Sequence, residues 1–154
     1  MSERYLIDKS ALARWAQPAV AEVLDPLLED GLLCISGAVH IETMYSARDA
    51  QHARKLEHFL SGFDYLHCPD EVWDAAVETQ GKAIKKGNHR ALSLPDLVIA
   101  ATAQRHRVTV LHYDEDYDQI AALSGHGSRW VVGRGTADAD EARRAAGLVP
   151  RGRG

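Results

Sequence analysis

The sequence predicts an α/β fold with a mostly parallel central sheet of four to five strands. Two observations predict it: short apolar runs recur along the chain, and segments with helical spacing of apolar residues follow nearly all of them. Parallel strands need long crossover connections, which are usually helices, so this alternation favours a parallel sheet. The length of 154 residues suits one compact domain.

The first half of the chain predicts two strands and four helices. Its first apolar run ends on a carboxylate, Asp8, and Ser10 is expected to cap the helix that follows. Gly31 is expected to end the helix before the second strand, because glycine readily adopts the left-handed conformation at helix ends. In order, we expect a strand at 4–8, helices at 11–16 and 20–28, a strand at 32–35, and helices at 36–47 and 50–60.

The second half of the chain continues the alternation with three strands and three helices. Its most distinctive helix starts at Ser93 and Pro95, and its small residues allow close packing on a sheet. In order, we expect a strand at 63–68, a helix at 70–86, a loop at 87–89, a helix at 93–106, a strand at 108–111, a helix at 115–123 and a strand at 130–132.

The end of the chain differs in composition from the rest. We expect one domain at 1–135 and a C-terminal tail at 136–154, which is either disordered or contains one short helix near 140–146. The stretch 148–152 resembles a protease-cleavage linker, which favours a vector-derived end. No run approaches the ~20 apolar residues that span a bilayer, so we expect a cytoplasmic protein without a membrane partner.

The charge of the chain limits how it can hold an anionic partner. A formal net charge of -4 argues against nucleic-acid binding through overall positive charge. Any such binding is expected to be local, and the candidate residues are Lys85, Lys86, His89 and Arg90. A solvated helix end and loop is the alternative interpretation of this group.

Four acidic residues from distant positions are predicted to meet at one edge of the sheet. Asp8 and Asp114 follow the ends of two strands, whereas Glu42 and Asp96 lie near the starts of two helices. Ligands of open parallel sheets bind beyond the carboxyl ends of the strands. A crossover helix runs antiparallel to the strands, so its start lies at the same edge. For each acid alone, a structural role remains open, such as the helix-start position of Asp96.

Crowded carboxylates repel one another unless a cation compensates their charge. Mg²⁺ is the natural partner, because it prefers oxygen ligands and works beside phosphate groups. The cluster contains no cysteine and no pair of histidines, which disfavours zinc. The sequence therefore predicts a hard divalent ion at this edge.

Four segments resemble the acidic signatures of the PIN-domain family, most closely its bacterial VapC-type toxins. They are 6–10, 40–42, 95–103 and 110–120, in the order and spacing of the family. The resemblance covers about 4–133 and implies a PIN-like three-layer fold. It also implies a ribonuclease that depends on Mg²⁺ or Mn²⁺ and acts as the toxin of a toxin-antitoxin pair. The implied partners are an RNA substrate, a cognate antitoxin and a second copy of the chain.

The resemblance also assigns roles to individual residues. Asp8, Glu42, Asp96 and Asp114 are expected to be catalytic, and Asp116 is a possible fifth acid. Ser10 matches a hydroxyl that often supports the first aspartate, and His112 stands where many members carry Thr or Ser. The implied metal ligands are Asp8, Asp96, Asp114 and Asp116.

Two other functions remain open. A strand-end aspartate in an α/β fold with magnesium also describes phosphohydrolases of the haloacid-dehalogenase type, with Asp8 forming an aspartyl-phosphate. That family expects a second aspartate two residues later, where this chain has Ser10. A catalytically inactive PIN module that only binds RNA or protein is the second alternative. Such a module is expected to lack an acid, and all four are present.

Overall fold

A five-stranded parallel sheet forms the centre of the computed structural model, which describes residues 3–137. The expected tail helix and cleavage linker lie outside the described residues. The strand order is β3-β2-β1-β4-β5, so the first strand lies in the middle. The strands are β1 (Tyr5–Ile7), β2 (Leu33–Ser36), β3 (Asp64–Leu66), β4 (Thr109–His112) and β5 (Ser128–Trp130).

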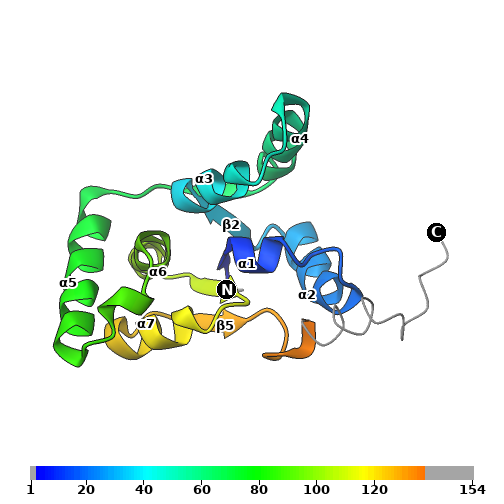
Figure 1. The fold of residues 1–154 in the computed structure, drawn as a ribbon. Helices are drawn as coiled ribbons and strands as arrows, with labels where there is room; N and C mark the ends of the chain where they lie inside the picture. The colour runs from blue at the N-terminus through cyan, green and yellow to red at the C-terminus, as the bar shows by residue number, and fades with distance from the viewer. Residues whose placement is uncertain (1–2, 138–154) are drawn as a thin grey trace.

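Helices cover both faces of the sheet, giving three layers (Figure 1). In this view α5, α6 and α7 lie on one side, α2 lies on the other, and α4 projects away from the body. The helices are α1 (Lys9–Leu12), α2 (Pro18–Glu29), α3 (Gly37–Tyr45), α4 (Ala50–Leu60), α5 (Asp70–Lys86), α6 (Leu94–His106) and α7 (Asp116–Ser124), with a 3₁₀ turn, η1, at His89–Ala91.

The strand register places the ends of the three central strands at one edge. Leu6 of β1 pairs with Cys34 of β2 and with Val110 of β4. Helix α6 packs against both β1 and β4. Its small buried residues, Ala100 and Ala103, permit this close approach, as the sequence predicted. The core therefore brings the start of α6 to the edge where β1 and β4 end.

The expected fold class is confirmed, and three local expectations are wrong. Helix α1 begins at Lys9 because Asp8 caps it, with its side chain accepting from the Ser10 N–H, so Ser10 is inside the helix. The last strand is at Ser128–Trp130, not 130–132, because β4 ends at His112, which pairs with Trp130. Residues His89–Ala91 form a 3₁₀ turn that the sequence did not predict.

Two further observations concern the limits of the domain. Ala137, two residues past the expected boundary at 135, is almost fully buried, and the boundary itself stays a prediction. Within the described part of the chain, no helix combines the length and the apolar character needed to cross a membrane.

Candidate metal and active site

The five acids that the sequence singled out lie together at the carboxyl edge of the sheet. They form two groups in which each residue offers a carboxylate oxygen within 4.8 Å of the others. Asp96 belongs to both groups and therefore joins them. The first group is Asp8, Glu42 and Asp96, and the second is Asp96, Asp114 and Asp116.

Burial makes this cluster electrostatically unfavourable without a cation. Asp8 is 3% exposed and Asp96 is 7% exposed, so water screens them poorly. Burial, reinforced by the charges of Asp8 and Asp114, raises the pKa of Asp96 to about 7. Burial also raises the pKa of Glu42, with the charges of Asp8 and Asp114 adding to the effect and Lys9 opposing it.

Glu42 carries a more direct sign of a missing partner. Its Oε1 atom is buried and accepts no hydrogen bond from the residues that the structure describes. A buried polar atom without a hydrogen bond destabilises a fold unless an ion or water satisfies it. The position of this oxygen in the acid cluster therefore fits a metal ligand.

Asp8 and Asp96 are connected by a tyrosine that sequence reasoning missed. The Tyr117 hydroxyl lies 2.8 Å from Asp8 Oδ1 and 3.2 Å from Asp96 Oδ1, and the residue is fully buried. Burial, followed by the charges of the two aspartates, raises the pKa of Tyr117 well above its ordinary value, so the phenol stays protonated. In the sequence Tyr117 lies within the segment 110–120, but an aromatic residue in a predicted helix is more often a core residue.

Ser10 and His112 support the acid-bearing segments through the backbone. The Ser10 N–H donates to Asp8 Oδ2 at 2.9 Å, whereas the Ser10 hydroxyl accepts from the Tyr113 N–H at 2.8 Å. His112 Nδ1 accepts from the Asp114 N–H at 3.1 Å, so its Nε2–H donates to the Ser128 hydroxyl. Burial lowers the pKa of His112, which favours this neutral form.

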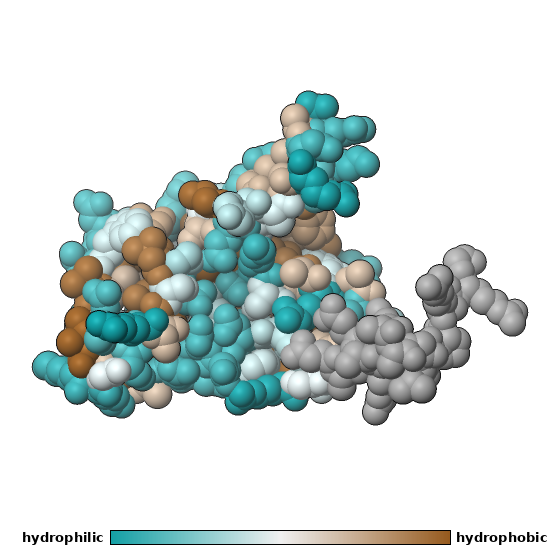
Figure 2. Space-filling view, in the orientation of Figure 1, coloured by the Kyte–Doolittle hydropathy of each residue, from teal (hydrophilic) through white to brown (hydrophobic). Residues whose placement is uncertain are grey.

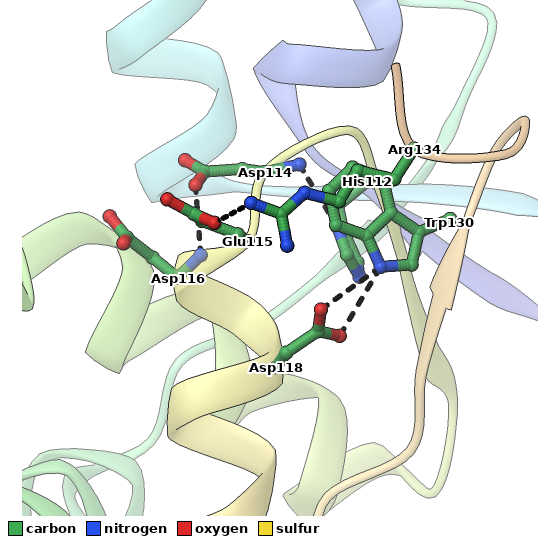
Figure 3. Close-up of polar contacts among 7 residues, drawn as sticks. All are labelled: His112, Asp114, Glu115, Asp116, Asp118, Trp130 and Arg134. Carbon is green, nitrogen blue, oxygen red and sulfur yellow. Dashed lines mark hydrogen bonds and ion pairs between the residues drawn. The ribbon is translucent and has the colours of Figure 1, made fainter. Parts of the chain in front are cut away.

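The segment from Asp114 to Asp118 turns from the strand edge into α7 (Figure 3). The Asp116 N–H donates to Asp114 Oδ1 at 3.0 Å, and this contact holds the Asp114 carboxylate against the backbone of Asp116. Burial and the charge of Asp114 raise the pKa of Asp116. Glu115 and Asp118 point elsewhere, toward Arg134 and the Trp130 indole.

A polar cavity of about 260 Å³ opens beside Asp114. Arg14 and Tyr113 line it, and the Arg14 guanidinium lies 4.4 Å from the centre of the Tyr113 ring. Trp130 and Arg134 also line it, and the Arg134 guanidinium lies 5.9 Å from the centre of the Trp130 ring. Sequence reasoning missed these residues because they are far apart in the chain and no motif joins them.

The cationic residues proposed from sequence occupy a different place. Lys85 and Lys86 end α5, and His89 and Arg90 lie in η1. None of the four lines the cavity beside Asp114. Their role in holding RNA therefore remains a prediction.

Comparisons with known proteins identify the family of this chain. A model of the PIN domain matches residues 5–123. Ribonuclease VapC21 of Mycobacterium tuberculosis is 44% identical to this chain, covering 89% of it and 100% of the relative. Ribonuclease VapC51 of the same species is 36% identical, with coverages of 90% and 100%.

Solved structures show the same fold at low sequence identity. The VapBC2 complex of Rickettsia felis, bound to a promoter DNA fragment, contains a chain with a TM-score of 0.68 and 18% identity, covering 82% of this chain and 97% of that one. VapBC-1 from nontypeable Haemophilus influenzae gives a TM-score of 0.68 and 16% identity, with the same coverages.

Proposed function

Because this chain belongs to the PIN-domain family and to its VapC group, we propose that it is a ribonuclease toxin that hydrolyses RNA at the acid cluster with a bound divalent ion. One observation carries the proposal: four acids from distant segments converge at the strand ends, with two of them almost fully buried. Such an arrangement destabilises the fold unless it binds cations.

Mg²⁺ is the ion that best fits the ligand set, with Mn²⁺ as a substitute. All candidate ligands are carboxylate oxygens, which hard cations prefer over nitrogen or sulfur donors. The unpartnered Oε1 of Glu42 supports its inclusion as a ligand. The proposed ligands are Asp8, Glu42, Asp96, Asp114 and Asp116.

The proposed reaction is hydrolysis of a phosphodiester. Water attacks phosphorus, and the bond between phosphorus and the 3′ oxygen breaks, leaving a 5′-phosphate and a 3′-hydroxyl. A bound divalent ion makes the attacking water more acidic and offsets the negative charge that develops on the phosphate. The protein holds the carboxylates in place through Tyr117 and the Ser10 N–H, and orders the Asp114 segment through His112.

The cavity beside Asp114 provides the proposed path for the RNA. Its arginines offer positive charge to backbone phosphates, and Trp130 offers a ring face on which a base can stack. In this proposal a chain with net charge -4 binds a polyanion through two local arginines, of which Arg134 is paired with Glu115 in the free protein and exchanges that partner for a phosphate. Lys85 and its neighbours are proposed as a second, more distant contact.

The proposed regulator is a cognate antitoxin, whose binding face we place on α3, α5 and the start of α6. An apolar cavity of about 310 Å³ there is lined by Ile41, Trp73 and Leu94 and also touches Glu42. Ile41 is 73% exposed, and large exposed apolar residues that gather around a cavity commonly mark binding sites. An antitoxin segment with apolar residues here and a basic residue beside Glu42 complements both features.

We also propose a homodimer and a cytoplasmic location. Exposed Val77 and Ile84 on α5 add to the apolar surface, which Figure 2 shows gathered over that helix. A two-fold dimer would cover part of it. A strictly monomeric protein in light scattering at micromolar concentrations would contradict the dimer.

The decisive test of function is RNA cleavage by purified protein free of antitoxin. Added Mg²⁺ or Mn²⁺ should support cleavage, EDTA should stop it, and sequencing of the ends should find 5′-phosphates. Undiminished cleavage in EDTA would refute the metal mechanism. Release of phosphate from small phosphomonoesters without RNA cleavage would favour the phosphohydrolase, and metal binding without either activity would favour an inactive module.

A further inference from the structure

We propose that Tyr117 is a positioning residue whose hydroxyl sets the spacing of Asp8 and Asp96, so that the cluster is arranged for a divalent ion before the ion binds. The inference rests on the proposed metal site and adds a residue to it. It assigns Tyr117 no contact with RNA or with the reacting phosphate.

The geometry behind this proposal is a single hydroxyl shared by two elements. Asp8 follows β1 and Asp96 lies in the first turn of α6, and the Tyr117 hydroxyl is within 3.2 Å of a carboxylate oxygen of each. Tyr117 itself comes from α7 and is fully buried. One side chain therefore connects three elements at the point where the two acid groups meet.

The aromatic ring is held firmly enough to define where its hydroxyl lies. The His112 ring packs at 4.9 Å and the His126 ring at 6.4 Å, measured between centroids. His112 is itself fixed by hydrogen bonds to the Asp114 N–H and Ser128. A rotation of Tyr117 would disturb these contacts, so the hydroxyl position is set by packing.

The hydroxyl leaves the carboxylates able to bind an ion. Each ionised carboxylate has about four lone-pair directions, and the hydroxyl uses at most one on each. Groups that hydrogen-bond to metal ligands typically change metal affinity or activity by about 10- to 100-fold when they are removed. The hydroxyl also offers its proton where two negative charges approach each other, which reduces their repulsion.

The competing explanation is that Tyr117 is only a core residue whose hydroxyl needs a partner. A core role predicts that Tyr117→Phe lowers the melting temperature but leaves metal affinity unchanged. A positioning role predicts a loss of affinity as well. Tyr5→Phe is a matched control, because Tyr5 is also buried and its hydroxyl contacts Glu3 and Arg129, at the opposite end of β1.

The experiment is calorimetric titration of Mg²⁺ and Mn²⁺ into metal-free protein without RNA. Tyr117→Phe should bind each ion about 10- to 100-fold more weakly than the natural chain, and Tyr5→Phe should bind equally well. In RNA cleavage, the metal concentration for half-maximal rate should rise by the same factor. The KM for RNA should not change, and the rate at saturating metal should approach that of the natural chain.

Tyr117→Phe is also tested in a Glu42→Gln variant, in case the single variant is too unstable to titrate. Glu42→Gln removes one charge from the cluster and leaves the Tyr117 contacts in place, so adding Tyr117→Phe should again weaken binding by a similar factor. Unchanged or tighter binding in both backgrounds would overturn the positioning role while leaving the metal site intact. Failure of the natural chain to bind either ion would instead overturn the site and this role together.

Discussion

Replacing Asp96 with asparagine separates a metal-site role from a helix-start role, because the two predict opposite changes in stability. Asp96 lies in the first turn of α6. A negative charge there interacts with the positive end of the helix dipole and stabilises the fold by about 0.3 to 1 kcal/mol. Its burial beside Asp8 and Asp114 has the opposite effect, since it raises the pKa to about 7. The larger of these two effects decides whether Asp96→Asn raises or lowers the free energy of unfolding.

The magnitude follows from that pKa. The change from 3.8 to about 7, at 1.36 kcal/mol per unit, corresponds to roughly 4 kcal/mol. Because the folded pKa is raised, the folded state binds more protons, and stability is lost as pH rises from about 4 to about 7. After subtraction of the helix term, the metal-free Asp96→Asn variant should be roughly 3 kcal/mol more stable above pH 7.

The assay is thermal unfolding of metal-free protein across pH, followed by RNA cleavage with the same preparation. At about 2 to 4 °C per kcal/mol, the variant should melt roughly 6 to 12 °C higher at pH 8 and at nearly the same temperature near pH 4. It should gain less stability from Mg²⁺, and its cleavage should fall by orders of magnitude.

Asp70→Asn is the matched control, since Asp70 lies in the first turn of α5, exposed and outside the acid cluster. It should lose no more than the helix term and cleave normally. An Asp96→Asn variant that is less stable at pH 8 and still cleaves at the normal rate would refute the reasoning. A stability difference that does not change with pH would do the same.

Two further predictions concern neighbours of the site. His126 is buried, which lowers its pKa to about 4, so its contribution to stability should be present above pH 6.5 and lost as pH falls toward 4. In metal-free protein, His126→Asn should remove this loss of stability at acid pH, which amounts to at most roughly 3 kcal/mol. Thermal unfolding across pH measures it, and the same pH dependence in the variant and the natural chain would contradict the prediction. Arg134→Ala should weaken RNA binding and reduce its salt slope by about 1 without changing metal affinity. Arg105→Ala, on another exposed surface, should change neither, and equal effects of the two variants would argue against the proposed RNA path.

Much of the fold was predictable because its signals are local. The apolar runs of β1, β2 and β4 are buried on both faces and read as short continuous strands. The predicted position of the edge strand β5 was wrong because the strand is defined by its pairing with β4, which ends at Trp130. The more apolar Val131 and Val132, which favoured the later position, follow the strand. The register of an edge strand depends on its partner strand, so the sequence of the edge strand alone does not predict it.

The acids of the site were predictable for a topological reason, and the residues around them were not. Strand ends and helix starts at one sheet edge can be placed from the order of elements alone. The contact of Tyr117 with Asp8, and the cavity between Arg14 and Arg134, depend on how side chains from separate elements pack. No regular spacing in the sequence predicts either this contact or this cavity.

The central position of β1 has a consequence for when activity can arise during synthesis. Asp8 is made with β1, but β4, which pairs with β1 and leads to Asp114, is made only after β2, β3 and the helices between them. Asp114 follows Asp8 by 106 residues, which at about 5 to 20 residues per second take the ribosome roughly 5 to 21 s to add. Until then the nascent chain carries an incomplete set of acids. A nascent chain that stops before β4 therefore cannot form the complete acid cluster.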